Sequence, residues 1–430
     1  MSNFKFQAAS VVTFLLWWVT PSQAQISGYT SFGYGYHQNP LANYARIPDQ
    51  IKQGYVSLSY DTEGDYSAFG LQYVGGLMAF NSFADRTFYE HRLAGTYSIR
   101  FEADSPDSTE SDEESDDSTA VKSKPPEEAS ARDSIDQYLS VTLAIAARHD
   151  KPLYLEFDNR GAELSATYRG TLGQSMYGRL TNQLAVRQYL SVTALSNTND
   201  LLSGEMGWLF QNGMTFGFTG SAGVKYYTNS AYDTTQYETS RSFTVNPAGK
   251  GKPGGKQLSS KTILVQPKAN GTVQIDGALF FRKDWSSQST LLASILYRRD
   301  VRSAVRYLAQ KTGASTMTED IYNDFFSYEG PEVRLRVAQP LPGGVQLVLE
   351  GELQSKRFAA PALTLGGEDK GENRKDVRST FDLYASRFVQ VWNDFGFDIS
   401  VSASLARNQS NDSYNDYSFQ AVSFGLGFSF

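Results

Sequence analysis

The chain has 430 residues, no cysteine and a formal net charge of −7, and 13% of its residues are aromatic. Its negative mean hydropathy and the lack of a second long apolar run exclude a bundle of membrane-spanning helices. Without cysteine the chain can have neither a disulfide framework nor a lipid-modified cysteine at its N-terminus.

The first segment, residues 1–24, has the features of a secretory signal peptide. Lys5 precedes an apolar run over residues 8–19, and Ser22 and Ala24 are the small residues before a cut near Ala24. The run is shorter than the ~20 residues that a membrane-spanning helix needs. A buried N-terminal helix is the alternative. The sequence therefore predicts an exported protein whose mature part is residues 25–430.

The mature part is dominated by segments in which large apolar residues alternate with small or polar ones. Residues 213–227, 345–353 and 394–406 show the pattern clearly, with charges and hydroxyls on one face and apolar side chains on the other. A two-sheet sandwich would alternate similarly, with its apolar face inside. Long strands with aromatic ends, together with an export signal, favour a barrel with lipid outside and water inside.

The predicted fold class is all-β, a transmembrane antiparallel up-and-down β-barrel of about sixteen strands. An even number of strands fits a single-chain bacterial barrel. Alternation is weaker between residues 135 and 193, so fourteen or eighteen strands remain open. The sixteen predicted strands are residues 27–36, 51–61, 66–79, 87–101, 135–147, 154–170, 179–193, 201–211, 213–227, 270–283, 287–300, 328–339, 343–357, 377–391, 394–406 and 417–430.

Residues 102–134 interrupt the strand pattern with an acidic insert. They contain twelve Asp or Glu against three Lys or Arg, a net charge of −9 that leaves +2 for the rest of the chain. A segment that cannot bury apolar surface is expected to be disordered. Strand parity places the insert on the periplasmic side, whereas one strand miscounted upstream would make it an outer loop that collects cations. A solvated linker without a specific partner is the simpler interpretation.

Short and long connections alternate after residue 200, so the short turns are expected in the periplasm and the long loops outside. The predicted long loops are residues 228–261, 301–327, 358–376 and 410–416.

Two features of these connections have alternative interpretations. Trp285 and Trp392 lie at short turns, where they fit an interfacial aromatic belt, although ordinary packing is the alternative. Residues 247–260 are rich in Gly and Lys, but Lys250 stands where a phosphate-binding loop needs glycine. We therefore expect a flexible basic outer loop, which serves solubility or contacts anionic surface polysaccharide.

The C-terminal strand places Phe424, Leu426, Phe428 and Phe430 on one face, opposite glycines and serines. With the signal peptide and the alternating strands, this ending resembles the bacterial outer-membrane β-barrel proteins. The resemblance implies a location among outer-membrane lipids and makes these four residues the insertion signal for the barrel-assembly machinery. It covers the whole mature chain as architecture, but it is shared by porins, transporters, enzymes and scaffolds.

A barrel of about sixteen strands is too wide for side chains to fill, so the predicted function is a passive pore for ions or small solutes. The alternative is a structural or docking barrel that binds envelope or surface partners through loops 228–261 and 301–327. Charges of both signs are expected inside, so strong ion selectivity is not predicted. The lumen-facing candidates are Lys225, Asp276, Arg282, Arg334, Arg336, Glu350, Glu352, Asp382 and Asp398.

One hairpin allows a prediction of register. A three-residue turn at residues 342–344 places Arg336 opposite Glu350 and Arg334 opposite Glu352. We expect these four charges to stack near the periplasmic mouth and largely cancel.

No catalytic, metal or cofactor site is predicted, and no nucleic-acid partner is expected. The chain has three histidines, and no nucleophile is identifiable beside His149 and Asp150. The signatures of zinc proteases and α/β-hydrolases are absent from the sequence. An N-terminal plug domain is missing because alternation begins around Ser27, which argues against energy-coupled transport.

Overall fold

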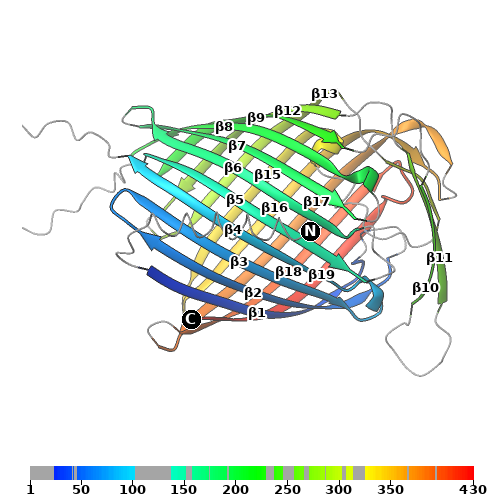
Figure 1. Ribbon diagram of the computed structural model, residues 1–430, viewed down its shortest axis with the longest axis horizontal. Helices are drawn as coiled ribbons and strands as arrows, with labels where there is room; N and C mark the ends of the chain where they lie inside the picture. The colour runs from blue at the N-terminus through cyan, green and yellow to red at the C-terminus, as the bar shows by residue number, and fades with distance from the viewer. Residues whose placement is uncertain are drawn as a thin grey trace, which may run out of the picture.

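Sixteen antiparallel strands close into one barrel in the computed structural model (Figure 1). The predicted signal peptide, apart from Ala24, and the acidic insert at 102–134 lie outside the described residues. Across the described part of the chain, no helix is long and apolar enough to cross a membrane. The structure describes residues 24–430 except 41, 43–45, 102–136, 152–156, 174, 191–192, 229–236, 246–255, 266–270, 286, 303–306, 313–324, 366–367 and 393–394.

The sixteen barrel strands match the predicted segments, so the predicted fold class is confirmed and the counts of fourteen and eighteen are excluded. The first eight are β1 (Ala24–His37), β2 (Asp49–Glu63), β3 (Ser67–Phe80), β4 (Phe88–Phe101), β5 (Gln137–Asp150), β6 (Asn159–Thr171), β7 (Met176–Tyr189) and β8 (Asn197–Leu209). The second eight are β9 (Met214–Tyr227), β12 (Gly271–Asp284), β13 (Thr290–Arg302), β15 (Tyr328–Leu341), β16 (Val345–Leu363), β17 (Asp369–Gln390), β18 (Gly396–Ser410) and β19 (Tyr417–Ser429).

The barrel closes where its first strand pairs with its last. Tyr29 on β1 lies opposite Ser429 on β19, and the pairing continues to His37 opposite Ala421. Next to this ladder, Gly28 and Phe430 exchange two backbone hydrogen bonds of 2.8 and 3.0 Å. Closure leaves the barrel without an unpaired edge, which a membrane interior requires.

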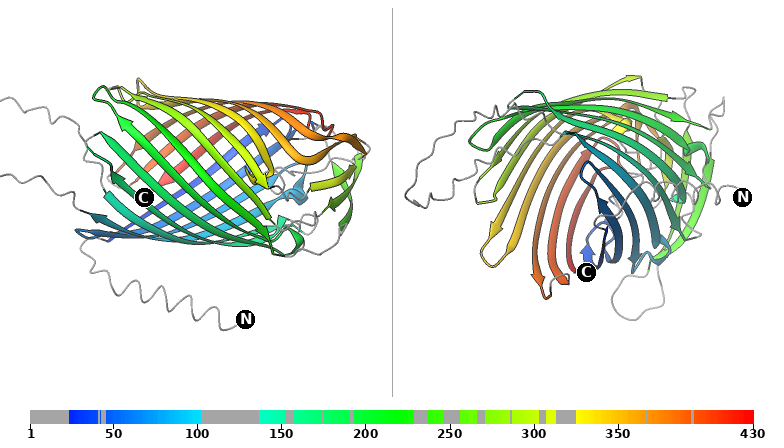
Figure 2. Two further views of the ribbon diagram at one scale, coloured as in Figure 1. Left: turned by 90° about the horizontal axis from the view of Figure 1, so that it is seen from above. Right: turned by 60° about the vertical axis from the view of Figure 1, so that its left-hand side comes forward.

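Consecutive antiparallel strands put alternate connections at opposite ends of the barrel (Figure 2). We call the end that holds Ala24, Ser429 and the short connections the turn end, and the opposite end the loop end. Strands β4 and β5 flank the acidic insert at the turn end, as strand parity predicted. Among the residues that the structure describes, three short 3-10 helices lie at the loop end: η1 (Ala84–Arg86), η3 (Thr193–Leu195) and η4 (Phe325–Ser327).

Two predicted loops contain strands that alternation did not reveal. Strands β10 (Tyr237–Val245), β11 (Lys256–Val265) and β14 (Tyr307–Thr312) form a separate sheet, of which β10 and β11 extend beyond the loop end in Figure 1. The prediction that residues 228–261 and 301–327 are loops throughout was therefore wrong. In the basic segment 247–260, residues 247–255 lie outside the described part, and β11 begins at Lys256.

The predicted loop at residues 358–376 was also wrong for most of its length. Strand β16 continues to Leu363 and β17 begins at Asp369, which makes these the two longest strands. Residues 369–376 are all charged or polar apart from Gly371, so the start of β17 shows no alternation of apolar and polar residues. Alternation of apolar and polar residues cannot mark such strands.

The hairpin of β15 and β16 has the predicted register, with Arg336 opposite Glu350 and Arg334 opposite Glu352. Residues 342–344 make the turn, in which Gly343 and Gly344 have φ of 83° and 75°. Only glycine adopts such angles without strain, so these two residues fix the turn and hence the register. The expectation that the charges lie near the turn-end mouth was wrong, because they lie midway along β15.

Candidate functional site

The two faces of the barrel wall can be distinguished by side-chain parity, because cross-strand partners share a face. Exposed large apolar residues such as Leu279, Ile295 and Phe424 mark the outer face. The residues directly before and after them on the same strands face the lumen. All nine predicted lumen residues lie on the inner face: Lys225, Asp276, Arg282, Arg334, Arg336, Glu350, Glu352, Asp382 and Asp398.

Arg334 is the centre of an ion-pair network midway along the lumen. Its guanidinium lies 3.0 Å from Glu352, 3.2 Å from Glu332 and 3.5 Å from Glu350. Arg336 lies 3.9 Å from Glu350. Exposed cross-strand ion pairs of this kind stabilise a sheet by roughly 0.2–1 kcal/mol each. Their stronger effect is geometric, since each arginine is held beside a carboxylate and the opposite charges largely cancel.

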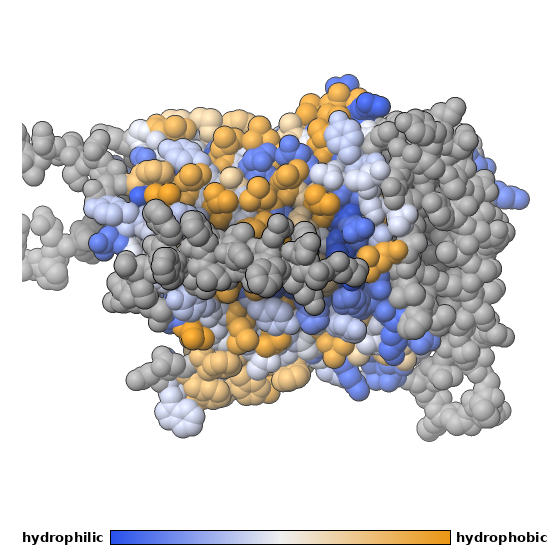
Figure 3. Space-filling view, in the orientation of Figure 1, coloured by the Kyte–Doolittle hydropathy of each residue, from blue (hydrophilic) through white to orange (hydrophobic). Residues whose placement is uncertain are grey.

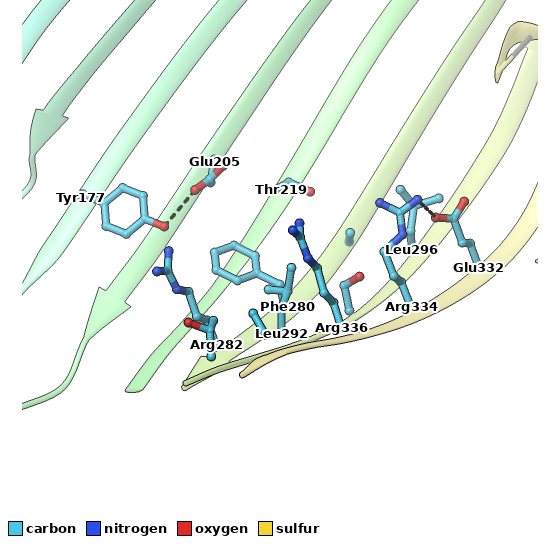
Figure 4. Close-up of a pocket in the computed structure, with 14 residues that line it drawn as sticks. Tyr177, Glu205, Thr219, Phe280, Arg282, Leu292, Leu296, Glu332, Arg334 and Arg336 are labelled. Carbon is cyan, nitrogen blue, oxygen red and sulfur yellow. Dashed lines mark hydrogen bonds and ion pairs between the residues drawn. The ribbon is translucent and has the colours of Figure 1, made fainter. Parts of the chain in front are cut away.

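A cavity of about 590 Å³ opens on the inner wall between β7 and β15 (Figure 4). Arg282, Arg334 and Arg336 line it, together with the apolar side chains of Phe280 and Leu292. Arg282 is itself paired with Asp284 at 2.8 Å. The cavity therefore offers guanidinium groups beside an apolar surface, within a wall where positive charges are matched by negative ones.

The other side of the cavity is built on Glu205, which the sequence analysis did not single out. The hydroxyl of Tyr177 donates to one carboxylate oxygen at 2.8 Å, and Arg179 donates to the other at 2.8 Å. Arg169 lies opposite Arg179 in the register, and its guanidinium lies 5.3 Å from the centre of the Tyr177 ring. Counting parity along β6, β7 and β8 would have placed all four residues on the inner face. We call the inner face of β7 to β16 around the cavity the arginine wall.

The facing part of the inner surface, midway along β17, β18, β19, β1 and β2, is lined mainly by short hydroxyl side chains. Ser402 and Ser423 are 2.6 Å apart, and Ser27 and Ser59 are 2.8 Å apart. Asp382 accepts a hydrogen bond from Ser404. Neither Asp382 nor Asp398 forms an ion pair in the described part of the chain. We call this surface the serine wall.

The inner face at the loop end is covered by residues of the outer loops. Lys225 has the predicted parity but is only 5% exposed, so it does not line open lumen. Phe326 of η4 packs over Gly223, where an added Cβ would meet its ring at 2.9 Å. On the opposite side Arg86 and Asp150 form a fully buried ion pair at 3.2 Å. Ordered loops therefore narrow the loop end from two sides.

The four residues of the predicted assembly signal lie on the outer face of the last strand. Phe424 and Phe430 are 51% and 55% exposed, and Leu426 and Phe428 share their parity. Glycines and serines of the same strand face the lumen.

The histidines do not assemble a catalytic group in the described part of the chain. His149 faces outward against the ring of Tyr89, while the following Asp150 faces inward. His91 faces outward as well, and its Nδ1 lies 2.7 Å from the hydroxyl of Tyr73. Among the described residues no cluster of three or more His, Asp or Glu could hold a metal ion.

No protein-family model matches the sequence, and no curated protein matches it. Several solved barrels are similar in structure. OccAB2 from Acinetobacter baumannii has 9% identity and a TM-score of 0.44, over 95% of this chain and 98% of that one. OpdK from Pseudomonas aeruginosa, solved with vanillate, has 10% identity and a TM-score of 0.43, over 94% and 98%. OccK2 (OpdF) from Pseudomonas aeruginosa, solved with glucuronate, has 10% identity and a TM-score of 0.38, over 95% and 98%.

Vanillate and glucuronate are the molecules present in those two solved structures, of OpdK and OccK2 respectively. A closed antiparallel barrel of sixteen strands is the architecture of porin-like outer-membrane β-barrels. The resemblance drawn from the sequence is therefore confirmed at the level of the fold.

Proposed function

We propose that this chain is an outer-membrane pore through which ions or small solutes diffuse passively. The observation that carries the proposal is the exposure of the arginine wall. The side chains of Arg282, Arg334 and Arg336 are 53%, 42% and 51% exposed, although they point toward the centre of the barrel. A packed interior would bury them, whereas a water-filled lumen leaves them exposed.

The test is ion conductance of the purified full-length protein in a planar lipid bilayer. We expect stepwise, ohmic current increments as single barrels insert. Two adjacent positions on β13 provide a matched pair of variants, because Ser294 lines the cavity and Ala293 faces outward. Ser294→Trp should lower the single-channel conductance, and Ala293→Trp should leave it unchanged. A folded barrel that carries no current, or equal effects of the two variants, would contradict a diffusive pore.

The outer face supports a place among outer-membrane lipids. It carries aliphatic and aromatic side chains along the strands, and Trp285 and Trp392 are exposed at the turn end. The outward Phe424, Leu426, Phe428 and Phe430 remain our proposed signal for the barrel-assembly machinery. Phe430→Ser should lower the amount of protein in the outer membrane without reducing export across the inner membrane. Cell fractionation measures both quantities, and normal outer-membrane levels would rule out this role.

The sheet of β10, β11 and β14 favours a second candidate, a docking barrel that binds an envelope or surface partner. A sheet formed from two separate connections offers a larger organised surface than a simple loop. Replacing residues 237–265 by a short Gly-Ser linker distinguishes the candidates. If the barrel docks a partner, the variant should lose partner capture, and its lumen should be occluded. If the barrel is a pore, the variant should keep its conductance.

A further inference from the structure

The outer wall of β1 to β7 carries positive charge without any carboxylate. Lys52 and Arg160 face outward and are exposed, and neither forms an ion pair within 4.0 Å among the described residues. All acidic residues of these seven strands face the lumen: Asp49, Asp61, Glu63, Glu90, Asp150 and Glu163. On this side of the barrel, hydrophobic residues gather over the middle and hydrophilic ones toward the loop end (Figure 3). The outer surface near the loop end is therefore cationic.

The two cations are level along the barrel axis. The paired row through Ser57 on β2 reaches Gly161 on β6. Lys52 lies five residues above this row and Arg160 lies one above it. The row itself climbs by about one residue per strand, because it runs from the middle of β1 to the loop end of β8. Over the four strands from β2 to β6 the climb makes up the difference.

This level is the boundary of the apolar band. By the same geometry Arg160 is level with Thr198, ten residues from the outward Trp208 near the turn end of β8. At about 3.4 Å per residue and a tilt of about 40°, the separation is about 26 Å, close to the height of the apolar band of such barrels. Tyr36 and Tyr89, also outward and at this level, are about half exposed, as in an interfacial belt.

Arg160 lies beside an aromatic pair. It is opposite Ala147 on β5, and His149 lies two residues farther along the same face. The ring of His149 is 5.4 Å from that of Tyr89 on β4. Diagonal neighbours of this kind are about 7–8 Å apart, so one small anion can contact both side chains. A guanidinium presents N–H groups in the geometry that phosphate oxygens accept, and imidazole and phenol groups can add hydrogen bonds.

The nearest carboxylate does not neutralise this surface. Asp158, two residues before Arg160, is buried and accepts a hydrogen bond from the backbone N–H of Asp150. The two aspartates belong to an inward cluster in which Asp150 is paired with both Arg86 and Arg148. Two carboxylates are thus balanced by two guanidinium groups inside the barrel, and the outward arginine is left over.

Outward cations on the other side of the barrel have internal partners. Arg407 on β18 lies 2.9 Å from Asp416, and Arg357 on β16 lies opposite Glu329. A ligand that is attracted by positive charge therefore has one preferred side of the barrel.

We propose that the outer face of β2 to β6 at the loop end binds the phosphate-bearing headgroup of a membrane lipid. Arg160 donates to the phosphate oxygens beside His149, and Lys52 adds a second charge at the same level. A lysine or arginine near an anionic membrane surface contributes a factor of roughly five in affinity. The site depends on the membrane location of the barrel and not on an open pore.

A lipid fits this surface better than an acidic protein would. Below Arg160, Leu93 on β4 and Ile145 on β5 lie opposite one another and are exposed on the same outer face. An acyl chain covers these residues while its headgroup stays at the boundary of the apolar band. A water-soluble acidic partner would contact the charges alone.

The first experiment compares two lipids that differ only in the headgroup. The purified full-length protein in neutral detergent receives equal amounts of dioleoyl phosphatidic acid and dioleoyl phosphatidylcholine, and native mass spectrometry counts each bound lipid. We expect the unmodified barrel to retain phosphatidic acid roughly tenfold more often. Arg160→Gln and Lys52→Gln should each lower this preference severalfold, and the combined variant should abolish it.

The matched control is Arg407→Gln, which removes an outward cation that already has a carboxylate. It should keep the preference, and heat-resistant migration on gels checks that every variant is folded. Equal retention of the two lipids by the unmodified barrel, or an equal loss in Arg407→Gln, would overturn the site. Inorganic phosphate at the concentration of the lipid should displace nothing, and displacement would mean that the cations bind a free anion instead of a lipid.

The second experiment locates the lipid and uses the absence of cysteine from the chain. Ala147→Cys and Ser379→Cys each place a thiol directly opposite an outward arginine, Arg160 and Arg407 respectively. Each variant is labelled with benzophenone maleimide and illuminated in vesicles of nine parts phosphatidylcholine to one part phosphatidic acid. Lipid captured at Ala147→Cys should be severalfold enriched in phosphatidic acid, and lipid captured at Ser379→Cys should match the vesicle. Capture of the bulk mixture at both positions, or of a second copy of the chain at Ala147→Cys, would overturn the proposal.

Discussion

The arginine wall and the serine wall face the same lumen, but the charged groups are paired on the first and unpaired on the second. On the arginine wall, Arg179, Arg334 and Arg336 each lie within 4.0 Å of a carboxylate. On the serine wall, Asp382 and Asp398 have no cation within that distance in the described part of the chain. The wall with more charges is thus nearly neutral, and the wall with few charges carries uncompensated ones.

The number of charged residues on a wall therefore does not by itself set the electric field in the lumen. Paired charges cancel within a few ångströms, while an unpaired carboxylate acts over about one Debye length, near 8 Å at physiological salt. We therefore expect a weak cation preference that originates from Asp382 and Asp398. The pairs on the arginine wall hold their side chains in place and shape the cavity.

Breaking the pairs of the arginine wall should have the largest effect. In Glu350→Gln with Glu352→Gln, Arg334 loses two of its three carboxylates and Arg336 loses the one it has. Arg336 then becomes uncompensated, Arg334 keeps only Glu332, and both guanidinium groups are freer to move into the lumen. We expect the anion-to-cation permeability ratio to rise severalfold, measured as reversal potential in a salt gradient across a planar bilayer.

The matched control adds Arg334→Gln and Arg336→Gln to the same variant. Because the cations are removed with the anions, the reversal potential should return toward that of the unmodified protein. A double variant whose reversal potential does not change, in a channel that still conducts, would show that these groups do not face the conducting path.

Removing the charges of the serine wall should have a smaller effect in the same direction. Asp382→Asn with Asp398→Asn deletes two uncompensated negative charges but frees no cation and moves no side chain into the lumen. We expect the weak cation preference to disappear without a change of sign. Ser400→Ala, also on the inner face of β18, is the control and should change nothing. Equal shifts from the two double variants would mean that net charge alone decides selectivity.

The fold and part of this comparison were predictable from the sequence, for a definite physical reason. A wall with lipid on one side and water on the other imposes a period of two, so sixteen strands and the faces of Arg334 and Glu352 could be counted. The burial of Lys225 could not, because the loop end is covered by segments such as η4, whose Phe326 packs over the neighbouring Gly223 and which carry no periodic signal. The strands β10, β11 and β14 were missed because the count relied on large apolar residues that alternate with small or polar ones, and these short segments are rich in Ser, Thr and Lys.

Glu205 allows a finer test of charge against hydrogen bonding within one cavity. Glu205→Gln removes the carboxylate beside Arg179, so we expect a modest shift toward anions, about half that of the double variant on β16. Tyr177→Phe removes only the hydrogen bond to Glu205 and leaves every charge in place. Its reversal potential should equal that of the unmodified protein. If Tyr177→Phe shifts the reversal potential as much as Glu205→Gln does, the position of the Glu205 carboxylate, rather than its charge, governs the selectivity.

The smallest effect is expected on the serine wall, where the hydroxyls bond to one another. Ser402→Ala with Ser423→Ala removes a side-chain hydrogen bond of 2.6 Å without creating a cavity. A net hydrogen bond is worth about 1 kcal/mol, and water in the lumen can replace part of it. We expect the free energy of unfolding in urea, measured in lipid vesicles, to fall by less than ~1 kcal/mol, with conductance and reversal potential unchanged. Ser402→Phe, which fills space at the same position, should lower the conductance instead. If the alanine pair altered selectivity, hydroxyl dipoles would have to join the two aspartates as sources of the field.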